Sequence, residues 1–511
     1  MAIVDFLLTP WTPVVLVVLY YLVPYFTTYS SLRDIPSPSL ASFTNFWLLL
    51  QCRQGQRWKS VDEAHKKLGK FVRIQPDHVS VADSDAIQVI YGHGNGFLKS
   101  SYYDAFVSIH RGLFNTRDRA EHTRKRKTIS HTFSTKSISQ FETYMHANLA
   151  TFVHQWDRLS DTAPQGRYAK IDSLHWFNYL AFDIIGDLAF GQPFGMLEKG
   201  KDMAEVRKTP DSPIRYAPAV EVLNRRGEVS GTLGILPQLK PYAKYFPDPF
   251  FSKGLAAVED LAGIAVARVS ARLDAEKGEA GQREQRVDLL ARLMEGKDET
   301  GAKLGRAELT AEALTQLIAG SDTTSNTSCA LLYWVLRTPG VIEKLQQELD
   351  AAIPAGTAIP NFAQVKDLKY VQNVISETLR IHSTSSLGLP RVVPPGGVTL
   401  FGRFFPAGTV LSVPAYTIHH SGEIWGPDAD EFVPERWDRL SERQKNAFIP
   451  FSYGPRSCVG RNVAEMELCL IVSTVFRRYE FELYQQELAT REGFLRKPLE
   501  CRVGLRKRQS I

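Results

Sequence analysis

The stretch "FSYGPRSCVG", residues 451–460, places one cysteine, Cys458, between two glycines and two residues after an arginine. The chain has 5 cysteines in 511 residues, at positions 52, 329, 458, 469 and 501, and no two form a C-x-x-C pair. An odd count without short spacings argues against a disulfide framework and against a zinc site, which needs four closely spaced ligands. Cys458 is therefore either an ordinary buried thiol or a residue that works alone.

A helix is predicted directly after Cys458, because "VGRNVAEMELCLIVSTVFRRY" carries apolar residues at helical spacing as far as Tyr479. The free N–H groups and the positive dipole end of a helix stabilise a thiolate. Gly454 and Gly460 let the backbone approach a flat ligand, and Arg456 supplies a fixed positive charge. A thiolate for iron and an arginine for a carboxylate are what a haem requires.

The pattern Phe-x-x-Gly-x-Arg-x-Cys-x-Gly resembles the haem-binding signature of the cytochrome P450 family and matches it at every fixed position. The resemblance implies a cytochrome P450 fold with a single catalytic domain. It also implies that Cys458 is the proximal thiolate ligand of haem b, and that Arg456 contacts the haem. A turn glycine and a buried cysteine would be the simpler interpretation for Cys458 alone.

A run of small polar residues, "AGSDTT" at 319–324, interrupts the long apolar helix predicted over 306–336. Such residues compete for backbone hydrogen bonds, so a local bulge is expected there. The run resembles the oxygen-activating motif of the cytochrome P450 family. By that resemblance Asp322 and Thr323 are the catalytic residues that relay protons during oxygen activation, and Gly320 opens the helix beside the haem.

The basic segment "EHTRKRKTISHTF" (121–133) resembles the family helix whose Trp-x-x-x-Arg motif meets the haem propionates. Here His122 stands at the aromatic position and Arg126 follows four residues later. Arg391, in "GLPR", resembles the other propionate contact. The neighbouring charges Arg124, Lys125 and Lys127 face either an acidic reductase or solvent. A nucleic-acid patch is the alternative for RKRK, and nothing else in the sequence supports it.

Glu377 and Arg380 lie at i,i+3 on one face of the helix predicted over 367–382. Together with Arg436 of "PERW" they resemble the Glu-Arg-Arg network of the family. We expect this trio to be structural and to hold the region before Cys458.

The N-terminal run from Ile3 to Phe26 contains one charged residue, Asp5, and includes "PVVLVVLYYLVPYF". It is just long enough for a bilayer core, and it lacks the basic start and clear cleavage site of a signal peptide. Basic residues follow the run, which places the large domain in the cytosol. We expect a single-pass anchor in the endoplasmic reticulum membrane over 1–30, a proline-containing hinge over 31–40, and a haem-thiolate domain over 41–511.

The body is predicted to be mainly α with a minor β portion. A hairpin is expected over 71–83, two strands joined at Pro406-Ala407-Gly408 over 397–416, and an exposed loop over 273–286. The net charge of +6 and the pI of about 8.9 are compatible with an acidic partner or membrane lipid, and do not require nucleic acid.

Nearly the whole chain resembles the fungal benzoate 4-monooxygenases, most specifically in the blocks "YGHGNGFLKS", "WFNYLAFDIIGDLAFGQPFGML", "EVLNRRGEVS" and "RIHSTSSLGLPR". The resemblance implies hydroxylation of benzoate to 4-hydroxybenzoate with O2. It implies electrons from NADPH through cytochrome P450 reductase, with cytochrome b5 as a further partner. Two alternatives stay open: the same chemistry on another small aromatic acid, phenol or aryl ether, and a haem-thiolate isomerase or dehydratase that uses no external electrons.

Attack at the para carbon requires the carboxylate to lie on the side away from the haem, where it needs a cation or several hydrogen-bond donors. The candidates are Lys99, Tyr102, Tyr103, Arg111 and the hydroxyl run 383–386.

Overall fold

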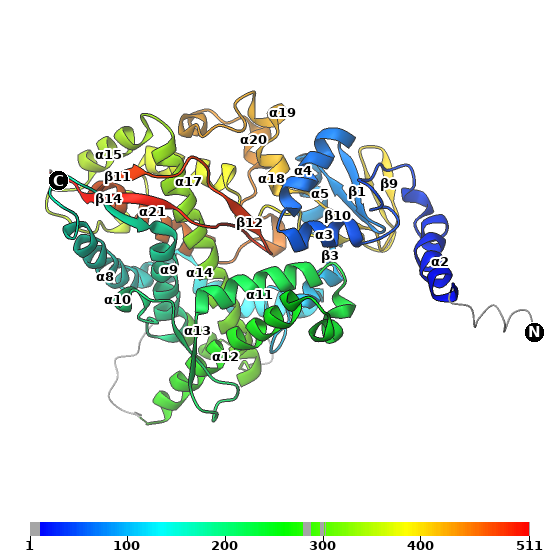
Figure 1. Ribbon diagram of the computed structural model, residues 1–511, viewed down its shortest axis with the longest axis horizontal. Helices are drawn as coiled ribbons and strands as arrows, with labels where there is room; N and C mark the ends of the chain where they lie inside the picture. The colour runs from blue at the N-terminus through cyan, green and yellow to red at the C-terminus, as the bar shows by residue number, and fades with distance from the viewer. Residues whose placement is uncertain (1–10, 279–287, 297–300, 302, 510–511) are drawn as a thin grey trace, which may run out of the picture.

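The structure is a computed structural model that describes residues 11–278, 288–296, 301 and 303–509. It is mainly helical with small sheets, as the sequence predicts. Figure 1 shows a larger helical part crossed by α14 (Arg306–Arg337) and a smaller part built on a sheet with α3 (Phe46–Gln54), α4 (Arg57–Leu68) and α5 (Asp85–Tyr91).

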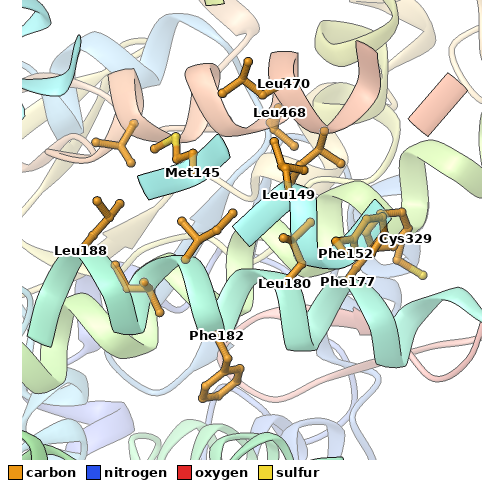
Figure 2. Close-up of a cluster of buried hydrophobic side chains, with 14 of the residues drawn as sticks. Met145, Leu149, Phe152, Phe177, Leu180, Phe182, Leu188, Cys329, Leu468 and Leu470 are labelled. Atoms are coloured by element: carbon orange, nitrogen blue, oxygen red, sulfur yellow. The ribbon is translucent and has the colours of Figure 1, made fainter. Parts of the chain in front are cut away.

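Four helices form the centre of the helical part: α8 (Glu142–Asp161), α9 (Ser173–Phe190), α14 and α21 (Arg461–Arg478). Figure 2 shows their side chains meeting, among them Leu149 of α8, Leu180 of α9 and Leu468 of α21. α9 is buried almost all round, as expected for a helix inside a large core. Each fully buried leucine or phenylalanine contributes about 1.5–3 kcal/mol, so this bundle is a rigid support.

The remaining helices lie around this centre and the sheet, except α2, which projects from one end of the body in Figure 1. They are α2 (Thr12–Phe26), α6 (Arg119–Ser130), α7 (Thr135–Ile138), α10 (Met196–Lys199), α11 (Ala219–Leu233), α12 (Pro249–Gly278), α13 (Leu289–Glu295), α15 (Val341–Ala352), α16 (Phe362–Val365), α17 (Lys369–Ile381), α18 (Ala415–His419), α19 (Gly422–Trp425) and α20 (Glu442–Ala447). Of the predicted loop over 273–286, residues up to Gly278 continue α12, and residues 279–287 lie outside the described residues.

The main sheet has the order β1-β2-β10-β7-β3. Its strands are β1 (Phe71–Gln75), β2 (His78–Val81), β10 (Val410–Ser412), β7 (Arg391–Val392) and β3 (Leu98–Lys99). β1 and β2 pair antiparallel, which confirms the first predicted hairpin. Small sheets are formed by β11 (Tyr479–Leu483), β14 (Arg502–Lys507) and β4 (Ala169–Asp172), by β12 (Thr490–Glu492) and β13 (Arg496–Pro498), and by β5 (Ala204–Val206) and β6 (Arg215–Ala217).

The prediction of two strands joined at Pro406-Ala407-Gly408 is wrong. The hairpin pairs β8 (Val398–Leu400) with β9 (Arg403–Phe405), and its turn is Phe401-Gly402, with φ of 50° and 78°. Two positive φ values in a two-residue turn match the twist of a hairpin. β10 follows the proline turn but pairs with β2 and β7 in the main sheet.

The predicted Glu-Arg-Arg trio is confirmed as a buried network. Glu377 accepts hydrogen bonds from Arg380 at 2.7 and 2.9 Å and from Arg436 Nε at 2.9 Å. Arg380 also donates to the carbonyls of His419 and Ala429. The network therefore joins α17 to the chain that leads toward Cys458.

Within the described ranges, no helix is both long and apolar enough to cross a bilayer. The anchor is predicted over 1–30, and residues 1–10 lie outside the described residues, so the anchor stays a prediction. The segment predicted as a hinge is docked on the body: Leu32 and Ile35 are buried, and Arg73 donates to the carbonyl of Leu32 at 3.2 Å.

Candidate functional site: a thiolate beside a group of buried cations

Cys458 lies immediately before the N-terminus of α21, as predicted. Its N–H donates to Phe451 O at 2.9 Å, which closes the preceding loop. At Gly454, φ is +70° and a side chain would collide with the carbonyl of Tyr91, so only glycine suits this position. The turn at Gly454 therefore depends on glycine at this position of the 451–460 segment.

The thiol of Cys458 is accessible although the protein surrounds it on most sides. Burial raises the pKa of this thiol, while the N–H of Gly460 and the charges of Arg126 and Arg461 lower it. Burial outweighs these contributions, so the pKa of Cys458 is raised overall, and the surroundings alone do not produce the thiolate that binds iron.

A group of basic side chains, which we name the cation cluster, lies next to Cys458. It consists of Lys99, His122, Arg126, Arg391 and Arg456. Burial and the charges of Arg391, Arg456 and Arg126 lower the pKa of Lys99 well below its usual value. Burial and the neighbouring arginines likewise lower the pKa of Arg456 to about 10.

The arginines of the cation cluster are held by neutral oxygens. Arg126 donates to Ser457 O at 2.7 Å, Arg456 to Thr116 O at 2.6 Å and Arg391 to the hydroxyl of Tyr103 at 3.0 Å. Among the described residues, no carboxylate lies within ion-pair distance of Lys99, Arg126, Arg391 or Arg456. Lys99 and Arg391 are buried and Arg126 and Arg456 are half-buried, and cations in such places that repel one another require anionic partners. The two propionates of a haem, beside a cysteine sulfur, meet that requirement.

His122 is buried on α6 within this cluster. Burial, followed by the charges of Arg456, Lys99, Arg126 and Arg391, lowers its pKa to about 3. His122 is therefore neutral, and it offers a propionate a hydrogen bond rather than a charge.

α14 runs without a break through the "AGSDTT" segment, so the predicted bulge is wrong. The hydroxyl of Thr323 donates to Ala319 O at 2.7 Å, and that of Ser321 to Leu317 O at 2.6 Å. These i−4 bonds accommodate the hydroxyls inside a regular helix.

Gly320 packs against α9, and its predicted place beside the haem stays a prediction. A Cβ at this position would lie 2.7 Å from Cδ1 of Ile185 on α9. The missing side chain therefore faces α9 and lets the two helices approach each other closely.

The carboxylate of Asp322 is buried and held by two partners. Lys497 of β13 lies 2.6 Å from Oδ1, and Asn326 donates to the same oxygen at 3.2 Å. Nζ of Lys497 in turn donates to Asn224 of α11 at 2.6 Å. Asp322 is thus the inner end of a polar chain that links α14 to β13 and α11.

A partly accessible face interrupts the otherwise buried surface of α14. Ala319 is exposed and Thr315 and Thr323 are half-buried, at i, i+4 spacing. Three rings form a group with centroids 5.1–5.7 Å apart: Phe106, Phe114 and Phe494. The segment before Phe114 reaches this face of α14, where a Cβ at Gly112 would lie 2.5 Å from Oγ1 of Thr315. This aromatic trio offers an apolar surface suited to a flat ring.

Comparisons with known proteins agree with this arrangement. The cytochrome P450 family model matches residues 36–504. The chain belongs to the cytochrome P450 family. It is 69% identical over 501 residues to benzoate 4-monooxygenase bphA of Aspergillus niger, covering 97% of this chain and 96% of that protein. It is also 29% identical over 508 residues to a cytochrome P450 monooxygenase of Aspergillus terreus, covering 95% of this chain and 98% of that protein.

The basic helix of this P450 does not present free charges to a partner at two of its positions. Lys125 is buried and pairs with Glu308, and Arg124 pairs with Glu308 and Glu121. Both predicted roles, a reductase-facing charge and a solvated charge, therefore fail for Lys125. Its ion pairs join α6 to the start of α14.

Several residues suggested for the substrate carboxylate have other partners in this P450. Lys99 belongs to the cation cluster, Tyr103 accepts from Arg391, and Arg111 pairs with Asp104 at 2.9 Å. Ser383 bonds to His419 and to backbone carbonyls. Tyr102 accepts from Arg57 at 3.2 Å.

A cavity of about 170 Å³ lies between α4, β2 and the segments 234–238 and 386–390. Cys458 and Ala319 do not line it, so it is separate from the thiolate site. Its cation, Arg57, is already paired with Glu492 at 3.2 Å.

Sequence reasoning missed Lys99 as a member of the cation cluster and Lys497 as the partner of Asp322. No local motif marks either residue, because each meets its partners only through the fold.

Proposed function

We propose that this P450 is a haem-thiolate monooxygenase that hydroxylates benzoate at the para position to give 4-hydroxybenzoate. The observation that carries the proposal is the 69% identity over 97% of the chain to a protein named benzoate 4-monooxygenase. The thiolate beside the cation cluster and the aromatic trio support it, since they suit a haem and a flat aromatic substrate.

Haem b, when bound, supplies the activation of dioxygen. Cys458 would bind its iron, and Arg126, Arg391, Arg456, Lys99 and His122 would hold its propionates. The three arginines would supply positive charge to the two carboxylates, and His122 would supply a hydrogen bond.

Asp322 and Thr323 would deliver protons during oxygen activation. Thr323 donates its own hydroxyl proton to Ala319 O at 2.7 Å, which leaves the lone pairs of Oγ1 free to accept a hydrogen bond. Asp322 is tied to Lys497, whose side chain is 13% exposed and so reaches toward solvent. A proton from solvent can pass along Lys497 to Oδ1 of Asp322.

Electrons would come from NADPH through cytochrome P450 reductase, with cytochrome b5 as a further donor. We also propose that the N-terminal segment places the protein on the endoplasmic reticulum membrane with the body in the cytosol. The exposed apolar side chains of α2, among them Leu16, Leu19 and Val23, support this location.

One turnover assay tests the function. The haem-loaded protein is combined with reductase, NADPH, oxygen and benzoate, and the product is compared with the three hydroxybenzoate standards by chromatography. We expect the 4-hydroxy isomer alone, and none without NADPH. A preparation that consumes NADPH with a substituted phenol or aryl ether but makes no hydroxybenzoate would refute benzoate as the substrate. Product formation from any substrate without NADPH would point to an isomerase or dehydratase.

A further inference from the structure

One arginine of α11 is buried without an anionic partner. Arg226 is 6% exposed, and within the described part of the chain no carboxylate lies at ion-pair distance from it. The neighbouring Arg225, by contrast, pairs with Glu221 of the same helix. Its Nη2 donates to the carbonyl of Phe106 at 3.2 Å, and its buried Nε has no hydrogen-bond partner. A buried guanidinium with an unused donor is costly unless an anion joins it.

A second unpaired donor lies one turn further along the same face. Ser230 is 1% exposed, and its Oγ has no partner. Residues at i and i+4 of a helix are neighbours, so the hydroxyl of Ser230 and the guanidinium of Arg226 lie on one patch of α11. A guanidinium and a hydroxyl together make a two-point donor set for a carboxylate.

Open space lies beside Gly227, which directly follows Arg226 and precedes Ser230 by three residues. Gly227 is buried, yet a Cβ built on it would have no atom of another element or of a side chain beyond its two chain neighbours within 4 Å. The next turn is closed instead, because a Cβ at Gly231 would lie 2.9 Å from Gly493 O. The space beside Gly227 is therefore local to Arg226 and Ser230.

The aromatic trio lies next to this patch. The guanidinium of Arg226 lies 5.2 Å from the ring centroid of Phe106, and Phe494 directly follows Gly493, which touches α11. A ring packed on the trio can place a carboxylate at Arg226 and point its far end away from α11.

The charges around Arg226 also favour an anion. Asp322 acts on it electrostatically but is itself paired with Lys497. Lys240 lies close enough for the charge of Arg226 to lower its pKa, which falls to about 8 mainly through burial. Cations thus outnumber free carboxylates here.

We propose that Arg226 and Ser230 of α11 bind the carboxylate of the aromatic acid substrate and thereby set the position of hydroxylation. This proposal rests on the proposed function, since it assumes an aromatic acid. It names residues outside the segments from which sequence analysis drew its candidates.

Binding of radiolabelled benzoate by equilibrium dialysis of the haem-loaded protein tests the proposal. Arg226→Gln removes the charge but keeps most of the volume. We expect the Kd for benzoate to rise at least about 30-fold, as for a truncated buried charge pair. Ser230→Ala should raise it about 5-fold, as for one lost hydrogen bond. The Kd for benzamide, a neutral analogue, should change less than about 3-fold in Arg226→Gln.

The matched control is Arg225→Gln. Arg225 is the adjacent residue on the same helix, is exposed and pairs with Glu221 at 2.7 Å. Its Kd for benzoate should stay within about 2-fold of the wild type, because surface ion pairs contribute little. Equal Kd values for Arg226→Gln and Arg225→Gln would overturn the proposal. A parallel loss of benzoate and benzamide binding in Arg226→Gln would also overturn it, since that outcome means a structural role.

Failure of the underlying function looks different. If the wild-type protein binds neither benzoate nor any other small aromatic acid, the proposed function is wrong and the carboxylate site falls with it. If the wild type instead binds benzoate with the same Kd as both Ser230→Ala and Arg226→Gln, only the carboxylate site is wrong. Thermal unfolding with and without benzoate gives a second measurement: benzoate should raise the Tm of Arg225→Gln but not that of Arg226→Gln.

Discussion

At position 322, a buried carboxylate is bound to a lysine whose side chain reaches solvent. Lys497 lies 2.6 Å from Oδ1 of Asp322, and Asn326 donates to the same oxygen. A carboxylate held in this way is fixed in place until its partners move. In the proposed function it would accept a proton from Lys497 and pass it toward Thr323, the next residue of α14.

Asp322→Asn should therefore slow catalysis while leaving substrate binding intact. We expect the rate of hydroxylated product formation to fall by on the order of 10²-fold, because a positioned acid–base group is lost. The Kd for benzoate should stay the same or decrease, because Arg226 loses a neighbouring negative charge. Single-turnover product formation and equilibrium dialysis measure the two quantities.

Asn326→Ser is the control for this prediction, since it removes a hydrogen bond to the same oxygen without removing the charge. It should slow product formation by less than about 10-fold. If both variants slowed the reaction equally, or if Asp322→Asn weakened benzoate binding strongly, Asp322 would have a structural role instead.

The residues of the site differ in how visible they are in the sequence. Cys458 and Arg456 could be predicted because all the fixed positions of the haem-binding pattern lie within the ten residues 451–460, although Arg456 finds its partner, Thr116 O, only through the fold. Lys99 meets Arg391 only because β3 and β7 pair, and Lys497 meets Asp322 only because β13 packs near α14. Arg226 is one of two adjacent arginines, and only the fold shows which of them is buried.

Among the helices, α21 and α14 are joined by a carboxyl that burial keeps protonated. Glu467 of α21 accepts a hydrogen bond from the hydroxyl of Thr324 of α14 at 3.0 Å. Burial raises the pKa of Glu467 to about 8, against an ordinary value of 4.5. α21, which follows Cys458, and α14 are thus held together through an acid that is neutral at pH 7.

This contact predicts a pH-dependent stability with a definite sign. A pKa raised in the folded state stabilises the fold below the unfolded value and loses that contribution as the pH rises toward the folded value. As the pH rises from about 4.5 to about 8, the contribution of Glu467 to the free energy of unfolding therefore falls by up to about 1.4 kcal/mol per pH unit. Glu467→Gln is neutral at every pH, so its stability relative to the wild type should increase from pH 5 to pH 8.

Denaturant unfolding of the haem-loaded proteins at several pH values measures this difference. Glu465→Gln is the matched control on the same helix, because its carboxylate pairs with Arg461 at the surface at 2.7 Å. The control should run nearly parallel to the wild type across the range. Parallel curves for Glu467→Gln as well would show that the buried carboxyl does not gain a proton on folding.

At the level of elements, helices could be predicted more reliably than strand partners. The helices at 306–337 and 461–478 follow from long periodic apolar patterns. The partners of β10 do not, because β2 lies far away in the sequence and only the fold brings the two strands together. The regular course of α14 was also missed, since a pattern of hydroxyls does not show whether they bond to solvent or to i−4 carbonyls.

Across the whole molecule, the interior carries cations arranged around the places proposed for carboxylates. The cation cluster faces Cys458, and Arg226 lies beside the aromatic trio. In the proposed complex the two propionates and the benzoate carboxylate supply the missing negative charges. Binding of haem and substrate should therefore contribute directly to the stability of the fold.

The N-terminal end of the molecule has the opposite character, because it exposes apolar rather than charged side chains. α2 projects from one end of the body in Figure 1 and exposes Leu16, Leu19, Leu22 and Val23. Its last turn is fixed to the body, where the rings of Tyr25 and Phe43 lie 4.3 Å apart.

Deletion of residues 1–28 should therefore abolish membrane binding without unfolding the body, because Leu32 and the rest of the buried core remain. In flotation with neutral phosphatidylcholine vesicles, we expect the full chain to float and the deleted chain to stay at the bottom. Each apolar side chain buried in lipid contributes about 1.5–3 kcal/mol, so a few such residues suffice. Flotation should persist at about 1 M salt, where the Debye length is ~3 Å, because the attraction is not ionic. A full chain that stays at the bottom, or one that leaves the vesicles at high salt, would contradict an apolar N-terminal membrane contact.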